Sequence, residues 1–365
     1  MKKFFSLTIY AFVLVIFFLS CSFTEPETKT EDLTIVSWNV QNLFDGSDNG
    51  FEYAEFQNSS GWNNEKYLAR LHGISSALGG ETKPDILALM EVENRAVIEQ
   101  LGGESFLNYR WTFFANAPDS SIGLGLLSSL PLTETRAHSF YSTDGTIPRP
   151  IAEVWVDTGH GPLVLFVCHL KSKLEGALKT TAARRAAAAL ITRRLLEIER
   201  ENPLTPVVIL GDLNENCDEF IRIGEEYICT LLPDTENAAL LIQGTPGKMP
   251  HLQDFLVLSE HKPPRTLFFP GRIALYSPWL EEADIGEAFG YIHQGSYYYK
   301  DTWETIDHFL LNAALFDGSS WNYGHFRVLG EPPFTNGRGF PEPYNLRTGN
   351  GLSDHLPILL YLYKH

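Results

Sequence analysis

The sequence predicts an α/β fold, and two kinds of segment predict it. Short runs rich in Val, Ile and Leu, among them 33–38, 86–90 and 207–210, have the length and composition of buried strands. The segments 66–78 and 181–196 instead have the composition and apolar spacing of helices. With 365 residues, 44% of them hydrophobic, the chain can bury a large core, and we expect 33–365 to form a single domain.

The stretch Pro206–Asn214 is the centre of the prediction. Its apolar half is interpreted as a strand, and Gly211 gives the backbone freedom where it leaves the sheet. Because side chains alternate along an extended strand, Asp212 and Asn214 are expected to point the same way. A carboxylate that accepts and an amide that donates would then share one small volume, which suits activation of a water beside an oxyanion. An Asx turn that merely ends the strand is the alternative interpretation.

Five further apolar runs also end, or begin, at polar residues. In chain order, these residues are Asn39, Glu91, His169 with Lys171, Asp307, and Asp354 with His355. Polar side chains presented repeatedly at strand ends indicate one convergent site on a rigid sheet core.

Six short motifs contain these residues: Trp38-Asn39, Met90-Glu91, His169-Leu-Lys-Ser172, Gly211-Asp-Leu-Asn214, Trp303-x-x-x-Asp307 and Ser353-Asp-His355. The set resembles the endonuclease/exonuclease/phosphatase superfamily, which includes deoxyribonuclease I, exonuclease III, sphingomyelinases and inositol-polyphosphate phosphatases. The motifs follow the family's order over nearly all of the mature chain. The resemblance implies a deoxyribonuclease I-like α/β (α+β) fold, a four-layer sandwich of two packed mixed β-sheets flanked by helices.

The chemistry of phosphate-ester hydrolysis explains why a metal site is expected. Water attacks in line while negative charge must be stabilised on the phosphoryl and leaving oxygens. Mg²⁺ does this with only one or two protein carboxylates, and Mn²⁺ or Ca²⁺ are alternatives. Glu91 is the leading ligand, since an acid at the end of an apolar strand is costly without a partner, and Asn39 and Asp354 are further candidates. Gln41 stands where the family often has Asp, which weakens the case for a second metal there.

The resemblance also assigns catalytic roles. Asp307 on one imidazole nitrogen of His355 would fix the ring's tautomer and raise the basicity of the other nitrogen. This pair would activate the nucleophile or stabilise the phosphate, and Asp212 is the competing general base. His169 and Asn214 would donate to a non-bridging phosphate oxygen.

The charge balance gives mixed indications. Lys and Arg number 28 against 45 Asp and Glu, so the formal net charge is −17 and the body repels polyphosphate at long range. Basic residues nevertheless accumulate from Lys171 to Arg200, beside His169. We interpret Lys171 as phosphate-binding, whereas the later arginines fit a solvated helix face. Arg149 is a second, looser candidate for phosphate binding.

The amino-terminal segment predicts export. Two lysines precede an uncharged apolar stretch, so residues 1–20 are interpreted as a signal peptide, with an uncleaved anchor as the alternative. Phe18-Leu-Ser-Cys21 resembles a bacterial lipoprotein box, which implies a lipidated Cys21 followed by a polar tether over 21–32. We expect a cell-envelope protein, lipid-anchored in the periplasm or at the outer surface, or a secreted one. That compartment would permit a disulfide between Cys217 and Cys229.

Together these features predict a monomeric Mg²⁺-dependent phosphoric ester hydrolase. A phosphodiesterase or nuclease acting on DNA or RNA is the first choice, with endo and exo action both open. A phosphomonoesterase or a phospholipase C-like hydrolase of inositol phosphates or sphingomyelin is the second. A non-catalytic surface lipoprotein is the third, although a binding protein has no use for the full acid, amide and histidine set. The region 218–296 predicts helices and long loops that set substrate choice.

Overall fold

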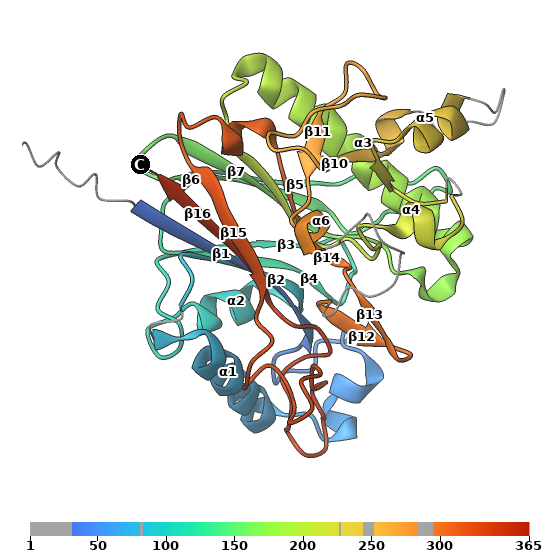
Figure 1. Ribbon diagram of the computed structural model, residues 1–365. Helices are drawn as coiled ribbons and strands as arrows, with labels where there is room; N and C mark the ends of the chain where they lie inside the picture. The colour runs from blue at the N-terminus through green and yellow to red at the C-terminus, as the bar shows by residue number, and fades with distance from the viewer. Residues whose placement is uncertain (1–30, 81–82, 226–227, 244–251, 283–294, 365) are drawn as a thin grey trace, which may run out of the picture.

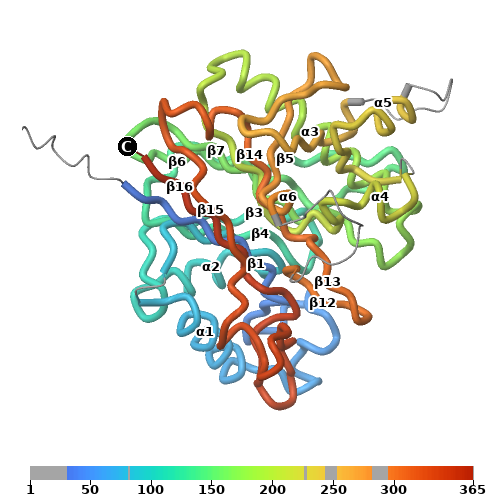
Figure 2. Tube along the Cα trace, viewed as in Figure 1, coloured from blue at the N-terminus to red at the C-terminus, as the bar shows by residue number. Residues whose placement is uncertain are grey.

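The computed structural model describes residues 31–364 apart from 81–82, 226–227, 244–251 and 283–294 (Figures 1 and 2). The predicted signal peptide, Cys21 and all but the last two residues of the predicted tether therefore lie outside the described residues. Within the described ranges, no helix combines the length and the hydropathy that crossing a membrane requires.

Six strands form the first sheet, in the order β15-β16-β1-β2-β4-β3. They are β1 (Glu31–Leu43), β2 (Ile86–Val92), β3 (Trp111–Ala115), β4 (Gly123–Ser128), β15 (Asn322–Val328) and β16 (Ile358–Lys364). The central strand β1 runs parallel to β2 and antiparallel to β16.

Eight strands form the second sheet, in the order β5-β6-β7-β8-β14-β11-β10-β9. They are β5 (Leu132–His138), β6 (Ile151–Asp157), β7 (Pro162–His169), β8 (Val207–Asp212), β9 (Leu231–Pro233), β10 (Leu256–Ser259), β11 (Ala274–Tyr276) and β14 (Asp307–Leu311). β7 and β8 are parallel, and β14 is antiparallel to β8. A separate hairpin joins β12 (Tyr297–Tyr299) to β13 (Thr302–Glu304).

The sheets pack face to face and helices cover their outer faces. The helices on these faces are α1 (Asn64–Leu78) and α2 (Arg95–Leu101) on the first sheet and α3 (Ala177–Glu201) on the second. The other described α-helices are α4 (Glu219–Arg222) and α5 (Glu236–Gln243), which share a separate cluster, and α6 (Trp279–Glu282), whose Trp279 packs between the sheets. Ile35 and Val36 show the division, because Ile35 packs between the sheets and Val36 packs under α1 and α2. α3 covers the outer face of the second sheet (Figure 1). Strands buried on both faces explain the continuous apolar runs, and the arrangement confirms the predicted four-layer sandwich.

Helix α3 is longer than the predicted helix, and its buried residues include a charged side chain. Leu178, which lies ahead of the predicted segment and in the first turn of α3, is 74% exposed. The residues that pack on the second sheet are Ala187, Ala188, Leu190, Ile191, Leu195 and Ile198. The first turns of α3 also bury Arg184, whose guanidinium donates to Glu215.

Two further expectations need correction. The described part of 218–296 contains the strands β9, β10 and β11, which extend the second sheet, in addition to helices and loops. Strands of three or four residues are too short to produce a periodic pattern.

Cys217 and Cys229 are buried thiols and form no disulfide. They belong to different clusters, since Cys217 packs between the sheets and Cys229 packs with Phe220 and Phe255.

Glu153 in β6 is a fully buried carboxylate surrounded by donors. Arg194 donates to both of its oxygens at 2.9 Å, Trp155 donates at 2.8 Å and Arg136 at 3.1 Å, and His138 Nε2 lies 2.7 Å away. Burial alone would raise the pKa of Glu153, but these partners outweigh it and hold the pKa well below its usual value.

This depressed pKa predicts part of the acid sensitivity of the protein. A carboxyl group whose pKa is lower in the folded state contributes its full stabilisation of the fold above the unfolded-state pKa, which is about 4.3 for Glu. This contribution is lost as the pH falls below that value. When the pH is lowered from 7 to 3, the free energy of unfolding of wild type should fall. For Glu153→Gln this fall is expected to be about 2 kcal/mol smaller. Urea denaturation at both pH values measures this difference. Glu134→Gln is the control, because Glu134 is 46% exposed, and equal acid losses in all three proteins would contradict the prediction.

Candidate active site

Strand ends from both sheets bring the predicted polar residues together. In the second sheet, parallel β7 and β8 place His169 opposite Asp212, and antiparallel β14 places Asp307 opposite the same Asp212. In the first sheet, parallel β1 and β2 bring Asn39 next to Glu91. Because parallel strands end at one edge of a sheet and antiparallel neighbours begin there, residues far apart in sequence meet at this edge.

Glu91 is held by an unusual backbone conformation. Gln41, Asn42 and Glu91 have φ values of 51°, 58° and 65°, a left-handed conformation that costs an L-residue about 1–2 kcal/mol. The backbone N–H of Asn42 donates to Glu91 Oε2 at 2.9 Å, and Asn39 Nδ2 donates to Oε1 at 3.1 Å. Buried Arg70 donates to three carbonyl oxygens of this turn. The turn therefore fixes the Glu91 carboxylate in a strained but well-supported position.

Asn39 connects Glu91 to the second sheet. Its Nδ2 also donates to Asp212 Oδ2 at 3.1 Å, so a single amide group contacts both carboxylates. His169 Nε2 lies 3.6 Å from the same Asp212 oxygen and 3.8 Å from Glu91 Oε1. The Glu91 side chain is 18% exposed, against 3% for Asp212. Glu91 is therefore the more open of the two carboxylates.

The end of β8 depends on a glycine and a left-handed asparagine. At Gly211, φ is +124°, and a Cβ there would lie 1.9 Å from the Cys168 carbonyl oxygen. β8 ends at Asp212, and Asn214 has φ 55° and donates its backbone N–H to Asp212 Oδ1 at 2.9 Å. The expected strand-like alternation of these two residues is therefore wrong, and the Asx turn is present while Asp212 still faces the site. Asn214 Nδ2 donates to the Leu170 carbonyl at 3.1 Å.

Asp307 and His355 form a buried hydrogen-bonded pair. His355 Nδ1 lies 2.8 Å from Asp307 Oδ2, and the Ser296 hydroxyl donates to the same oxygen at 2.6 Å. Asp307 Oδ1 is buried and has no hydrogen-bond partner among the described residues. One ligand atom each from Asp212, Asp307 and His355 lies within 4.8 Å of the other two. The pair and Asp212 thus form one compact cluster.

Burial and charge separate the pKa values of these groups. Burial raises the pKa of Asp212 to about 7, with Asp307 adding to the rise and His355 opposing it. Burial alone would lower the pKa of His355, but the adjacent Asp307 carboxylate raises it to about 10. Burial, followed by the positive charges of Arg149 and His355, lowers the pKa of His169 well below its usual value. His355 is thus a cation near neutral pH, and His169 is neutral.

The two predicted phosphate-binding residues lie in different surroundings. Arg149 donates to the carbonyl oxygens of His169 and Leu170, both at 3.1 Å. Burial lowers the pKa of Arg149, and the nearby carboxylates of Glu91 and Asp212 oppose this shift. Lys171 points elsewhere, since its ammonium group bonds to Glu175 at 2.5 Å and its side chain is 45% exposed. The structure thus brings Arg149 to the cluster, and the contacts of Lys171 lie outside it.

The basic segment after His169 is largely engaged in ion pairs. These are Lys171 and Lys179 with Glu175, Lys173 with Glu219, Arg184 with Glu215, and Arg194 with Glu153 and Glu197. Arg184 is 1% exposed, so the expected solvated helix face does not include it. The local positive charge is therefore smaller than the sequence indicates.

The donor types present fit a divalent cation. Carboxylate oxygens are the ligands that Mg²⁺ prefers, and Mg²⁺ usually keeps several waters. Glu91 is partly exposed, so a cation bound there could keep its waters. Asp212 lies beside Glu91, because Asn39 donates to both carboxylates. Asp354 is half-buried and influences the pKa of neighbouring His355, but it is not part of the compact ligand group. Glu91 is therefore the better-supported part of the predicted metal site, whereas Asn39 turns its Nδ2 donor to the carboxylates and its Oδ1 accepts the Gln41 N–H at 3.0 Å.

Three supporting residues were not predicted. Gln41 Oε1 accepts the Tyr344 backbone N–H at 2.7 Å, so this side chain anchors a distant loop. The Ser353 hydroxyl donates to the Asn39 carbonyl at 2.6 Å and accepts the His355 N–H at 3.1 Å. Ser296 contacts Asp307 as described above. Ser353 belonged to a recognised motif, whereas Ser296 carried no sequence signal beyond its place ahead of a strand.

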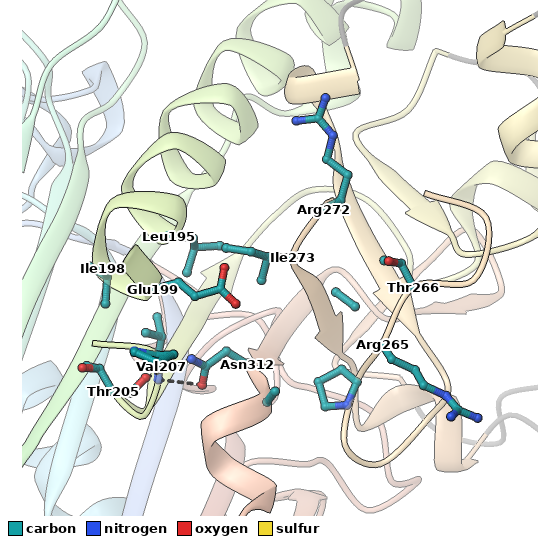
Figure 3. Close-up of a pocket in the computed structure, with 14 residues that line it drawn as sticks. Leu195, Ile198, Glu199, Thr205, Val207, Arg265, Thr266, Arg272, Ile273 and Asn312 are labelled. Atoms are coloured by element: carbon teal, nitrogen blue, oxygen red, sulfur yellow. Dashed lines mark hydrogen bonds between the residues drawn. The ribbon is translucent and has the colours of Figure 1, made fainter. Parts of the chain in front are cut away.

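A separate pocket lies at the other end of β8. Its walls come from the end of α3, Val207, the loop at 264–266 and the segment at 272–274 (Figure 3). Figure 3 shows Asn312 beside the first residue of β8, where its Oδ1 accepts the Val207 N–H at 2.9 Å. Because β8 begins at Val207 and ends at Asp212, this pocket is not part of the polar cluster.

Known proteins place the chain in a family. Residues 34–221, just over half of the chain, match the model of the endonuclease/exonuclease/phosphatase family. Truncated Caenorhabditis elegans TDP2 is similar in structure, with 15% identity, a TM-score of 0.51 and coverage of 91% of this chain and 98% of that one. An endonuclease/exonuclease/phosphatase family protein from Bacteroides thetaiotaomicron has 16% identity, a TM-score of 0.52 and coverage of 92% and 96%. No curated protein matches the sequence. The chain belongs to the endonuclease/exonuclease/phosphatase family, a family of phosphoester hydrolases.

Proposed function

We propose that this protein is an exported, divalent-metal-dependent phosphodiesterase that cleaves nucleic acid. The observation that carries the proposal is the convergence of Asp212, the Asp307–His355 pair and Glu91 at one edge of the two sheets. The family supports hydrolysis of a phosphate ester. Export rests on residues 1–20 and the lipoprotein-like Cys21, and it is part of the same proposal.

The chain's own residues divide the work of hydrolysis. Asp212 is oriented by donors on both oxygens, Asn214 on one and Asn39 on the other, and it takes the proton of the attacking water. His355 uses Nδ1 for Asp307, which leaves Nε2–H of the imidazolium to donate to a phosphate oxygen. Neutral His169 adds a second donor.

The metal would be held mainly by Glu91, with Asn39 beside it. When bound, a divalent cation supplies positive charge that stabilises the phosphoryl oxygens during attack. Because Glu91 already accepts two hydrogen bonds, its carboxylate is preorganised and does not have to be ordered by the ion.

Removing the metal is expected to abolish activity. Protein without residues 1–30 should hydrolyse bis-p-nitrophenyl phosphate in Mg²⁺, lose the activity in excess EDTA and regain it when Mg²⁺ exceeds the chelator. The physical reason is that the phosphate enters a site that already contains the carboxylates of Glu91, Asp212 and Asp307, and the cation offsets part of this negative charge. Release of p-nitrophenolate measures the rate. Full activity in EDTA would contradict the metal role.

A small phosphate ester is the second candidate substrate. Ion pairs engage Lys171, Lys173, Lys179 and Arg184, so this described part of the basic segment offers less positive charge to a long polyanion. Plasmid DNA, RNA, sphingomyelin and inositol phosphates, compared side by side, separate the two candidates. Inorganic phosphate released from a monoester, with plasmid DNA intact, would favour the second. Cleavage of DNA or RNA with a steep loss of rate in high salt supports the first.

A further inference from the structure

The Asp307–His355 pair is contacted on two sides by the segment that begins the β12–β13 hairpin. Ser296 is fully buried, and its hydroxyl donates to Asp307 Oδ2, the same oxygen that His355 Nδ1 contacts. The next residue, Tyr297, stacks on the His355 ring with 4.5 Å between centroids and 29° between the planes. Adjacent residues therefore contact the carboxylate and the imidazole separately.

The backbone of this segment is tied to the same two partners. The Ser296 carbonyl accepts the N–H of Leu356, the residue after His355, at 2.7 Å, and Tyr297 forms a β-bridge with His355. The Ser296 N–H donates to the Glu304 carbonyl at 3.0 Å across the hairpin. A movement of the hairpin would consequently move the serine hydroxyl, the tyrosine ring and the His355 backbone together.

Ser296 limits the directions that Asp307 can adopt. Asp307 Oδ1 has no partner among the described residues, so without the serine only His355 would hold this carboxylate through its side chain. A carboxylate with two donors on one oxygen has a defined plane, and that plane sets the direction of the imidazole. Partners of this kind, which orient an active group without touching substrate, typically affect activity by about 10- to 100-fold.

We propose that Ser296 and Tyr297 are positioning residues for the Asp307–His355 pair, with Ser296 fixing the carboxylate and Tyr297 fixing the plane of the imidazole. The proposal rests on the proposed phosphodiesterase function for its kinetic consequences. Its structural content concerns the geometry of the pair alone, which does not depend on the substrate.

The first test compares two buried serines. Ser296→Ala is expected to lower kcat on bis-p-nitrophenyl phosphate about 10- to 100-fold with KM nearly unchanged. Ser37→Ala is the matched control, because Ser37 is also fully buried and its hydroxyl has no hydrogen-bond partner among the described residues. Wild-type kcat in Ser296→Ala would overturn the role of the serine.

Two further comparisons separate positioning from general structural support. Adding Ser296→Ala to His355→Ala should cause no further loss of kcat, since the serine acts only through the histidine. Tyr297→Phe keeps the stacked ring and should retain kcat within about twofold, whereas Tyr297→Leu should lose it as Ser296→Ala does. A further drop in the double variant, or equal rates for Phe and Leu, would overturn the proposal.

A spectroscopic measurement tests the geometry without any substrate. The Nδ1–H proton of His355 should give a downfield NMR resonance in wild type and Ser37→Ala, and this signal should broaden or shift in Ser296→Ala. If wild type hydrolyses no phosphate ester, the proposed function fails while this measurement still decides the positioning role. An unchanged resonance in Ser296→Ala would overturn that role.

Discussion

Asp212→Asn is expected to lower kcat on a phosphodiester by at least about 10²-fold, the usual cost of losing an acid–base group. Asparagine keeps the shape of the side chain and one acceptor oxygen for the Asn214 N–H, but it cannot take a proton from water. Because the proton moves from water to Asp212 only in the transition state, KM should change little. Steady-state rates on bis-p-nitrophenyl phosphate measure both constants.

The same variant distinguishes a general base from a metal ligand. If Asp212 acts only as a base, the Mg²⁺ concentration that gives half-maximal activity should be the same in wild type and Asp212→Asn. A large increase would instead place Asp212 among the ligands. Asp218→Asn is the control for loss of a carboxylate charge after β8, since Asp218 forms a half-buried pair with Arg222. A near-normal rate for Asp212→Asn would remove this residue from the mechanism.

The sequence predicts the convergence of the site because local patterns define strand ends. His169 and Asp212 each end an apolar run, and the parallel pairing of two such runs places their last residues opposite each other. Asp307 begins a run that pairs in the opposite direction, which brings it to the same place. No detail of side-chain packing was needed for this conclusion.

The local conformation around Glu91 could not be predicted in the same way. The left-handed residues Gln41 and Asn42, whose turn holds the Glu91 carboxylate, are supported by Arg70, which reaches their carbonyl oxygens from α1. Propensities describe a residue and its close neighbours, whereas this conformation depends on a partner that only the tertiary fold supplies. The same reason applies to Ser296, whose importance arises from its contact with Asp307.

The basic segment shows that a helix can be predicted correctly while the exposure of its charged side chains is predicted wrongly. Alanine content predicted the helix α3 correctly, and its arginines were interpreted as a solvated helix face. The structure instead buries Arg184 against Glu215, a residue located after β8. Sequence spacing within one helix contains no information about an acid on another segment.

The buried Arg184–Glu215 pair connects α3 to the loop that follows Asp212. Arg184 Nε donates to Glu215 Oε1 at 2.6 Å, and its other nitrogens donate to the Lys171 carbonyl and to two threonine hydroxyls of α3. Glu215 Oε2 accepts the backbone N–H groups of Thr230 and Leu231 at 2.6 and 3.1 Å. Both charged side chains are 1% exposed. One ion pair therefore ties together the segments after β7 and β8, which carry the site.

Arg184→Met is expected to lower the free energy of unfolding by about 3–5 kcal/mol, because it leaves the Glu215 carboxylate buried without its cation. Urea denaturation at pH 7 measures this loss, and Arg222→Met, which breaks a half-buried pair with Asp218, should cost no more than about 1 kcal/mol. Arg184→Met combined with Glu215→Gln should lose less than the sum of the single changes, since the double variant retains no unpaired charge. Strict additivity would mean that the two residues stabilise the fold independently, and that the pair does not hold the two segments together.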